Sequence, residues 1–190
     1  MNFLEIVKAF EKNGFEAYFE KTVADGVKKC LSLISQGSVV GWGGSMSCVD
    51  SGLIKSVKES FTIIDRDTAK DSQERNALLR KILAEADVFL TSFNAVTEDG
   101  KALNIDGSGN RVAAISFGPK SVIALVGKNK IVKDEDQAYE RASTVAAGKN
   151  AVRFGKKYEE GDSLCNMVQI LRRGGNGRIK IVFVDEELGY

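Results

Sequence analysis

Residues 38–47 read SVVGWGGSMS, and this stretch decides the fold. It opens with Ser38-Val39-Val40, a short apolar run that is typical of a buried strand. The run leads directly into the glycine turn Gly41–Ser45, and the apolar spacing of residues 46–58 then predicts a helix. A strand, a glycine turn and a helix in immediate succession indicate the βα unit of an α/β protein.

The glycine turn is also the first candidate binding site. Backbone N–H groups that converge near a helix start attract anions. Gly43 and Gly44, with the hydroxyls of Ser45 and Ser47, would hold a phosphate, a carboxylate or the pyrophosphate of a larger ligand. A tight turn also needs glycine for its backbone conformation alone, so a purely structural role stays open.

Dinucleotide binding is an alternative for the same turn. The sequence differs from a P-loop, because no lysine follows the glycines, and from GxGxxG, because Met46 stands at the third glycine position. Asp65, however, ends the next predicted strand and is placed like an acid that binds a ribose. A dinucleotide at Gly41–Ser45 with its ribose on Asp65 therefore remains a hypothesis.

Strand and helix patterns alternate outward from this turn in both directions. The helical spacings cover residues 2–13, 22–35, 70–85 and 134–150, and the buried strands cover 61–65, 87–93, 121–126 and 178–185. Residues 102–105 read as a hairpin partner after the turn at 94–100, residues 15–20 as a weak strand, and 111–117 and 165–171 as either helix or strand. We expect a three-layer α/β/α sandwich with a mainly parallel sheet, formed by a single domain over 1–190, with 1–20 as an optional N-terminal helical appendage.

Composition excludes several classes of partner. The 190 residues are 43% hydrophobic and 28% charged, an ordinary globular balance. With 27 basic and 26 acidic residues, the chain has no basic excess for nucleic acid or a membrane surface. It has no apolar run of membrane length and no signal-peptide core, and its cysteines, Cys30, Cys48 and Cys165, show no CxxC spacing, so we expect a cytoplasmic protein.

The absence of histidine narrows the chemistry further. With no histidine in the sequence, Ser-His-Asp triads, Cys-His dyads and HExxH zinc sites are excluded. Catalysis would then depend on carboxylates, lysines, hydroxyls, thiols or backbone amides. We predict no metal site.

Residues 87–130, DVFLTSFNAVTEDGKALNIDGSGNRVAAISFGPKSVIALVGKNK, form the second candidate site. Polar residues gather there at strand ends and in loops, where α/β proteins usually bind ligands. The candidate ligand-binding residues are Asn94, Thr97, Asn104, Asp106, Asn110 and Arg111, and the candidate catalytic residue is Glu98.

Each of these residues also has a structural interpretation. Glu98 would act as a nucleophile or general base, or be a solvated carboxylate in a hairpin turn. Arg111 would clamp a carboxylate or phosphate with two hydrogen bonds, or form a salt bridge with Asp106 that holds the glycine loop. Asn104 and Asn110 would bind ligand or stabilise turns.

The remaining charged and sulfur-bearing residues are predicted to have structural roles. Lys128 and Lys130 follow a buried strand and read as a solvated charge pair, with contact to an anionic ligand as the alternative. Cys165 reads as an inert thiol rather than a nucleophile, because no histidine or second cysteine lies near it in sequence. The basic residues around Gly174–Gly177 read as a solvated turn.

Three stretches of the chain resemble the lactate-utilisation (LUD) domain family. They are GGSMS at 43–47, the long run ADVFLTSFNAVTEDGKALNIDGSGNRVAAISFGPKSVIALVGKNKIV at 86–132, and GRIKIVFVDEELGY at 177–190. The resemblance spans roughly residues 12–190. It implies the fold shared by ribose-phosphate isomerases, glucosamine-phosphate deaminases and CoA transferases, in which the first glycine loop binds phosphate or the pyrophosphate of CoA.

This sequence lacks most of the catalytic signatures of that superfamily. The histidine of the deaminases and the DGAD signature of the isomerases are absent, and Glu98-Asp99-Gly100 resembles only loosely the Glu before Asn-Gly of the CoA transferases. Many LUD proteins are similar in having a cysteine-rich stretch before the last strand. Here only Cys165-Asn166 matches it.

The resemblance implies a part in the oxidation of lactate or a related small organic acid. The expected ligand is a small anionic metabolite at Gly41–Ser47, with CoA or a phosphorylated compound as a candidate cofactor. The alternative is a non-catalytic subunit that works beside iron–sulfur partner proteins. A homo-oligomer is compatible with either function.

Overall fold

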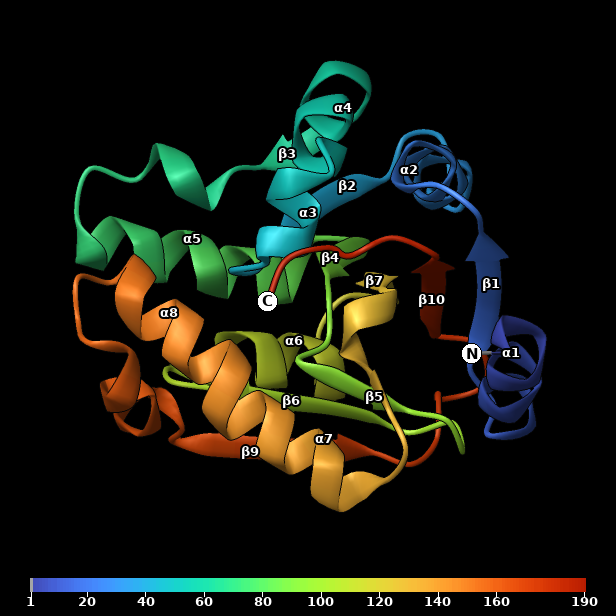
Figure 1. Ribbon diagram of the computed structural model, residues 1–190. Coiled ribbons are helices and arrows are strands. Elements are labelled where there is room, and N and C mark those ends of the chain that lie inside the picture. The colour runs from blue at the N-terminus through green and yellow to red at the C-terminus, as the bar shows by residue number, and fades with distance from the viewer. Residues whose placement is uncertain (1) are drawn as a thin grey trace.

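The computed structural model describes residues 2–190 and contains two sheets (Figure 1). The larger sheet has six strands in the order β1-β10-β7-β4-β2-β3, and every neighbouring pair is parallel. Its strands are β1 Glu16–Glu20, β2 Val39–Trp42, β3 Thr62–Ile64, β4 Val88–Thr91, β7 Ser121–Gly127 and β10 Ile179–Val184. The predicted parallel sheet is confirmed.

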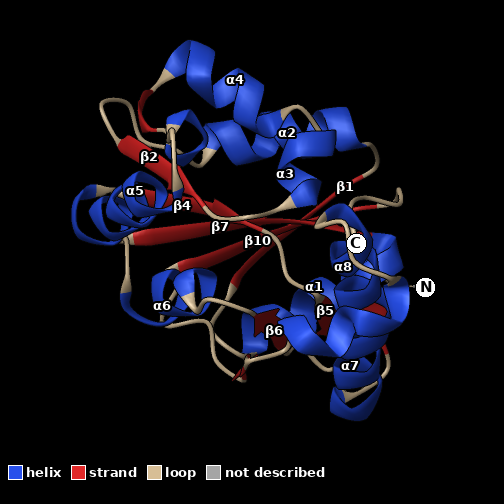
Figure 2. Cartoon of the chain, turned by 90° about the vertical axis from the view of Figure 1, so that its left-hand side faces the viewer, coloured by secondary structure: helices blue, strands red, loops and turns tan. Residues whose placement is uncertain are grey.

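Helices cover both faces of this sheet, which makes the three predicted layers (Figure 2). One face carries α2 Val23–Ser32, α3 Met46–Asp50 and α4 Leu53–Ser60, and the other carries α1 Phe3–Lys12, α5 Ser72–Glu85 and α6 Asn110–Phe117. The strands have continuous apolar sequences because both faces are buried. In β7, Ile123 and Leu125 pack toward the first group of helices, and Val122 and Ala124 pack toward the second.

Residues 3–20 lie within these layers. β1 pairs in parallel with β10 and forms one edge of the six-stranded sheet. The apolar stripe of α1 packs into the core, where Phe10 is fully buried between Phe15 and Phe183. Residues 3–20 are therefore a helix and an edge strand of the sandwich, in place of the appended segment that the sequence allowed.

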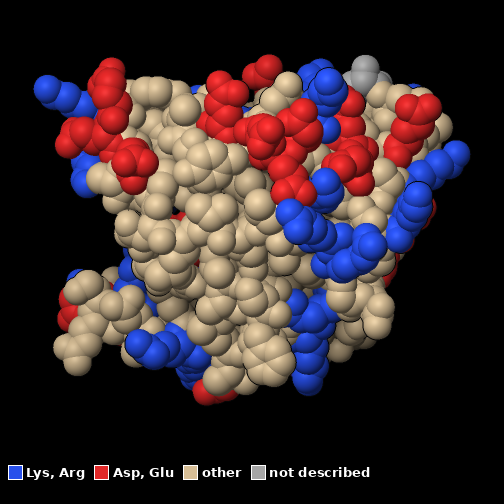
Figure 3. Space-filling view, turned by 90° about the horizontal axis from the view of Figure 1, so that it is seen from below, with Lys and Arg blue, Asp and Glu red and all other residues tan. Residues whose placement is uncertain are grey.

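A second, four-stranded sheet lies beside the first in the order β8-β5-β6-β9. Its strands are β5 Ala95–Thr97, β6 Ala102–Asp106, β8 Ile131–Val132 and β9 Met167–Leu171, and helix α7, Glu135–Arg141, packs on it. The predicted hairpin is confirmed as β5 and β6, and the ambiguous stretches are helix α6 and strand β9. The edge strand β9 leaves Val168 and Ile170 exposed. Seen from below, the molecule has an uncharged central area with charged side chains gathered around it (Figure 3).

Two predicted helices are interrupted. The helix expected over 46–58 is split into α3 and α4, because Gly52 lies between them with a left-handed backbone (φ 78°). The helix expected over 134–150 consists of α7, a π-helical segment at Ala142–Ala146 and α8, Ala147–Arg153. No helix in the described residues 2–190 is long and apolar enough to cross a membrane.

Candidate functional site

The loops that follow β2, β4 and β7 meet at one edge of the larger sheet. β3 lies on one side of β2 and β4 on the other, so the winding direction of the sheet reverses between β2 and β4. Ligands of open α/β sheets bind outside the carboxyl ends of the strands at such a point. The loops that lie there contain Gly43–Ser45, Ser92–Asn94 and Lys128–Lys130.

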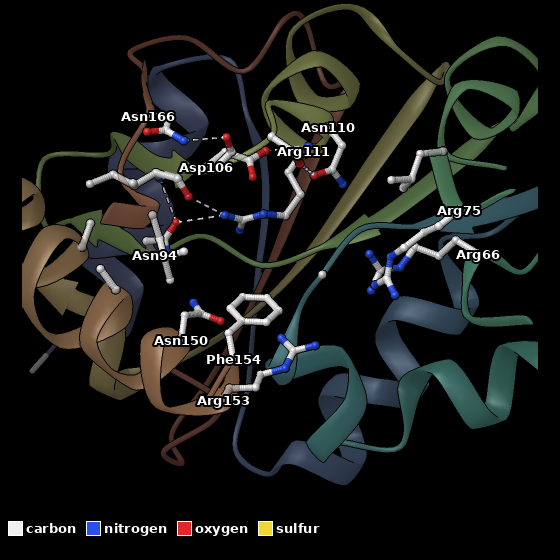
Figure 4. A pocket seen from close by; sticks show the side chains of 18 of the residues that line it. Arg66, Arg75, Asn94, Asp106, Asn110, Arg111, Asn150, Arg153, Phe154 and Asn166 are labelled. Atoms are coloured by element: carbon white, nitrogen blue, oxygen red, sulfur yellow. Dashed lines mark hydrogen bonds between the residues drawn. The ribbon is translucent and has the colours of Figure 1, made fainter. Parts of the chain in front are cut away.

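A cavity of about 700 Å³ opens at this edge, between α5, α6 and α8 and the second sheet (Figure 4). Its lining carries five basic side chains and one carboxylate. The basic residues are Arg66, Arg75, Arg111, Arg153 and Lys156, and the acid is Asp106. Five asparagines, at positions 76, 94, 110, 150 and 166, and the ring of Phe154 complete much of the surface.

Arg66 and Arg75 lie side by side on one wall of the cavity (Figure 4). Arg66 is only 6% exposed, and its Nε is buried without a hydrogen-bond partner. Both arginines share Asp67, at 3.3 and 3.7 Å, and Asp67 also accepts a bond from Trp42. Desolvation lowers the pKa of Arg66, and the positive charges of Arg75 and Arg153 lower it further. This wall therefore has positive charge that the protein does not fully neutralise.

Arg111 lies on the opposite wall and is held by three oxygen acceptors. Its guanidinium donates to Asn104 Oδ1 at 3.3 Å, Asn94 Oδ1 at 3.4 Å and the Ile105 carbonyl at 2.5 Å. Desolvation lowers the pKa of Arg111, and the charge of Asp106 opposes this shift. Neutral oxygens thus fix the Arg111 guanidinium in place. None of them cancels its positive charge, which faces the cavity.

Asp106 has a different role from the expected salt bridge. Its Oδ2 accepts the backbone N–H groups of Arg111, at 2.8 Å, and Val112, at 3.3 Å, at the start of α6. Asn110, the first residue of α6, lines the cavity with a buried Nδ2 that has no partner. Buried polar atoms are nearly always paired, so the unpaired Nδ2 of Asn110 and Nε of Arg66 are unusual features of the cavity lining.

The glycine turn contributes to the cavity through Gly44 and Ser45, but not through Ser47. Gly44 lines the main cavity, and Ser45 lines a smaller hollow beside it. Ser45 also caps α3, because its side chain accepts the Cys48 N–H at 3.4 Å. Ser47 is fully buried, and its hydroxyl donates to the Leu188 carbonyl at 3.3 Å.

Gly43 is required for the close approach of Arg111. A Cβ at Gly43 would lie 2.6 Å from Cγ of Arg111 and 2.9 Å from Cζ of Phe89, whereas a Cβ at Gly44 would meet only Arg66, at 3.8 Å. We expect Gly43→Ala to displace Arg111 and to cost about 1–3 kcal/mol of stability. The thermal midpoint should fall by about 2–10 °C, and Gly44→Ala should leave it nearly unchanged. Equal effects of the two substitutions would contradict this assignment.

The smaller hollow, of about 30 Å³, borders the cavity and contains Lys130. Lys130 is 3% exposed, and its Nζ donates to Ser47 Oγ at 2.8 Å, Ser92 Oγ at 3.1 Å and the Phe93 carbonyl at 3.2 Å. Burial lowers its pKa to about 7. The prediction of a solvated charge pair is therefore wrong for Lys130, although Lys128 is exposed and pairs with Asp185 at 3.1 Å.

Other predicted residues lie away from the cavity. Thr97 and Glu98 are at the far end of β5, where the next turn contacts Asn13 at the end of α1, and the side chain of Glu98 is exposed. Asn104 is 1% exposed and acts behind the cavity wall by holding Arg111. Asp65 caps the turn at Arg66–Thr68 and pairs with Lys58 at 2.6 Å.

The cysteines and the basic residues around Gly174–Gly177 do not line the cavity. Cys165 is partly exposed, and desolvation followed by the charge of Asp162 raises its thiol pKa. Arg178 donates to three carbonyls at the end of α6 and in the following turn, so it is a structural cap rather than a solvated side chain. Within the part of the chain that is described, no cluster of three histidine, cysteine or acidic residues could hold a metal ion.

The fold and the cavity define a class of α/β protein with a basic ligand cavity at the carboxyl edge of a parallel sheet. Comparison with known families identifies the family within this class. The LUD domain family model matches residues 4–184, and the chain belongs to that family. This confirms the resemblance that the sequence motifs indicated.

Two solved structures are similar to this chain. A DUF162 family protein from Deinococcus radiodurans matches with a TM-score of 0.54 and 17% identity, over 97% of this chain and 98% of its own. A D-ribose-5-phosphate isomerase in complex with phospho-erythronic acid matches with a TM-score of 0.34 and 15% identity, over 70% of this chain and 66% of its own. A search of curated proteins found no match.

Proposed function

We propose that this LUD domain protein binds a small organic acid carrying at least two anionic groups, as part of the use of lactate or a related acid. The observation that carries the proposal is the charge of the cavity lining. Four arginines and one lysine face a single carboxylate, and Oδ2 of that carboxylate is already bonded to the backbone of α6. Arginine matches carboxylate and phosphate oxygens with paired N–H groups, which suits this lining to such a ligand.

The size of the cavity favours a ligand larger than lactate itself. A volume of about 700 Å³ lies within the usual range for sites that bind whole metabolites or cofactors. The arginine pair at Arg66 and Arg75 lies on the wall opposite Arg111, so two separate anionic groups would be bound. A phosphorylated acid or a CoA-linked acid meets both conditions.

The proposal is tested by a binding screen on the purified chain. The panel contains lactate, glycolate, sugar phosphates, CoA, acetyl-CoA and NAD(H), followed by thermal shift and calorimetry. A ligand at 100 times its dissociation constant adds about 2.7 kcal/mol of stability, which for this size raises the thermal midpoint by roughly 5–11 °C. We expect shifts from phosphate-bearing ligands, and we expect added salt to reduce them.

Two arginines of the lining offer a matched mutational test. We expect Arg75→Gln and Arg153→Gln each to weaken binding of the best ligand by about tenfold or more, because each removes a charged hydrogen-bond donor from the cavity. Arg80→Gln is the control, since Arg80 lies on the same helix as Arg75 but outside the lining. Calorimetry measures the three dissociation constants.

The competing functions predict different outcomes of the same screen. Binding of NAD(H) alone, unaffected by Arg75→Gln, would contradict the proposal and favour a dinucleotide site. A panel without any binding would also contradict it and would favour the alternative of a non-catalytic partner subunit. Pull-downs from native cells would then search for iron–sulfur partners.

A further inference from the structure

Lys130 is a buried amine without a carboxylate partner. It ends the short turn that follows β7, where η2 spans Lys128–Lys130, and this turn directs its side chain inward. Its Nζ contacts two hydroxyls and one carbonyl, all of them neutral oxygens. No salt bridge joins it to an acid anywhere in residues 2–190. A buried ammonium in such surroundings is poorly stabilised.

The charges around Lys130 favour the neutral amine. Desolvation is the largest cause, and together with the positive charges of Arg141, on α7, and Arg111, on α6, it lowers the pKa of Lys130 to about 7. Cys48 and Asp50, on α3, act in the opposite direction. Burial raises the pKa of the Cys48 thiol to about 11, so that group carries no negative charge at neutral pH. A lysine that is desolvated and lies near other cations is the form that reacts with carbonyl compounds.

The hollow that contains Lys130 also contains groups that bind a carboxylate. Arg111 and Arg153 line it together with Lys130, and both also line the larger cavity. The hollow has a volume of about 30 Å³, so it admits only the small end of a molecule whose remainder lies in the cavity. Ser92 lines the same hollow with its hydroxyl 3.1 Å from Nζ.

We propose that Lys130 is a nucleophilic amine that forms an imine with the carbonyl carbon of an aldehyde acid or a 2-oxo acid, whose carboxylate is bound by Arg111 and Arg153. This assignment names the substrate class of the cavity and rests on the proposed function, because the same arginines hold the anion. Lys130, Arg111 and Arg153 all line the hollow, and the amine has no competing acid. The assignment makes the hollow a reaction site and the larger cavity a binding site.

The proposed step is balanced without an oxidant or a reductant. The Nζ lone pair attacks the carbonyl carbon, and the carbonyl oxygen takes up a proton and becomes a hydroxyl. Ser92 is hydrogen-bonded to Nζ and relays the proton that nitrogen loses to that oxygen. The hydroxyl then takes the remaining Nζ proton, again through Ser92, and leaves as water while the C=N bond forms, so one amine and one carbonyl yield one imine and one water.

Reductive trapping with glyoxylate tests the proposal directly. Glyoxylate is the smallest aldehyde that carries a carboxylate, and cyanoborohydride reduces its imine to a stable adduct that peptide mass spectrometry locates. We expect Lys130 to be labelled about tenfold faster than the exposed neighbour Lys128 at pH 7.5, because only a neutral amine attacks carbonyls. The rate at Lys130 should rise through neutral pH and level off above it.

Three variants separate this chemistry from unspecific labelling. Lys130→Met should abolish the fast adduct, and Lys128→Met should leave it unchanged. If Lys130→Met does not fold, Arg153→Gln keeps the amine and should slow its labelling by removing a carboxylate contact. Labelling of Lys128 or other exposed lysines as fast as Lys130 would overturn the proposal, as would an unchanged rate in Arg153→Gln.

The two proposals fail separately. Phosphate-bearing ligands are titrated by calorimetry on the same preparation. Their binding without any fast adduct at Lys130 would overturn the imine and leave the proposed function standing. A fast adduct at Lys130 without such binding would support the amine chemistry and contradict the proposed function.

Discussion

Replacing Lys130 with methionine is expected to remove the contribution of one buried amine to the pH dependence of stability between pH 7 and 10.5. In the folded protein the pKa of Lys130 is about 7, against an ordinary value of 10.5. Between these values the unfolded chain binds more protons than the folded chain, so the free energy of unfolding rises with pH. The slope reaches at most about 1.4 kcal/mol per pH unit.

The sign of this effect follows from the direction of the shift. Below pH 7 Lys130 is protonated in both states, and its burial destabilises the folded protein by the full amount. Above pH 10.5 it is neutral in both states, and the penalty disappears. The destabilisation therefore grows as the pH falls from 10.5 to 7.

Chemical denaturation at several pH values measures the effect. The Lys130→Met curve should rise less with pH than the wild-type curve, by the contribution of one proton. The raised thiol pKa values of Cys30 and Cys48 oppose the rise above about pH 9 in both proteins, so the difference between the two curves isolates Lys130. Methionine also leaves Ser92 and the Phe93 carbonyl without a donor, but that cost is independent of pH. Lys128→Met is the control and should run parallel to the wild type. Parallel curves for Lys130→Met and wild type would contradict the lowered pKa.

The larger features of the fold could be predicted because they depend on local patterns. Strands buried on both faces have continuous apolar sequences, and Val39–Trp42 and Ser121–Gly127 are clear examples. The interruption at Gly52 and the π segment at Ala142–Ala146 could not be predicted. The apolar spacing continues through each of them, so the pattern predicts an unbroken helix in both places.

About a quarter of the cavity lining consists of residues that the sequence singled out. Gly44, Asn94, Asp106, Asn110 and Arg111 line it, and all of them lie in or beside loops at strand ends. The short strand β5 has polar residues at both ends, and the sequence does not indicate which end faces the cavity. Asn94, before the strand, lines the cavity, whereas Thr97 and Glu98 lie at the opposite end of β5.

The charged residues of the lining that the sequence did not single out look like ordinary surface charges. Arg75 and Arg153 lie on helices α5 and α8, at positions that a helical pattern assigns to solvent. They reach the cavity because α5 and α8 both border it in the folded chain. Lys130 also looks like a surface charge in the sequence. Its burial depends on the turn after β7 and on contacts with Ser47 and Ser92. Sequence spacing contains no signal for either arrangement.

Arg111→Ala is expected to reduce stability by about 2–4 kcal/mol and to abolish anion binding. The guanidinium satisfies three oxygens, on Asn94, Asn104 and Ile105, and these residues are at most 8% exposed. Alanine leaves the three acceptors without their donor, and water from the cavity replaces it only in part. The thermal midpoint should fall by roughly 4–16 °C.

Arg111→Lys distinguishes the geometry of this side chain from its charge. Lysine keeps the positive charge but has no planar fork, so it cannot reach three separated oxygens at once. We therefore expect Arg111→Lys to lose most of the stability that Arg111→Ala loses, while it retains part of the binding of a phosphate-bearing ligand. Full recovery of stability by lysine would mean that charge alone holds this wall. A loss of binding in Arg111→Lys as complete as in Arg111→Ala would instead mean that the ligand is recognised by the fork, because the charge is the same in wild type and lysine variant.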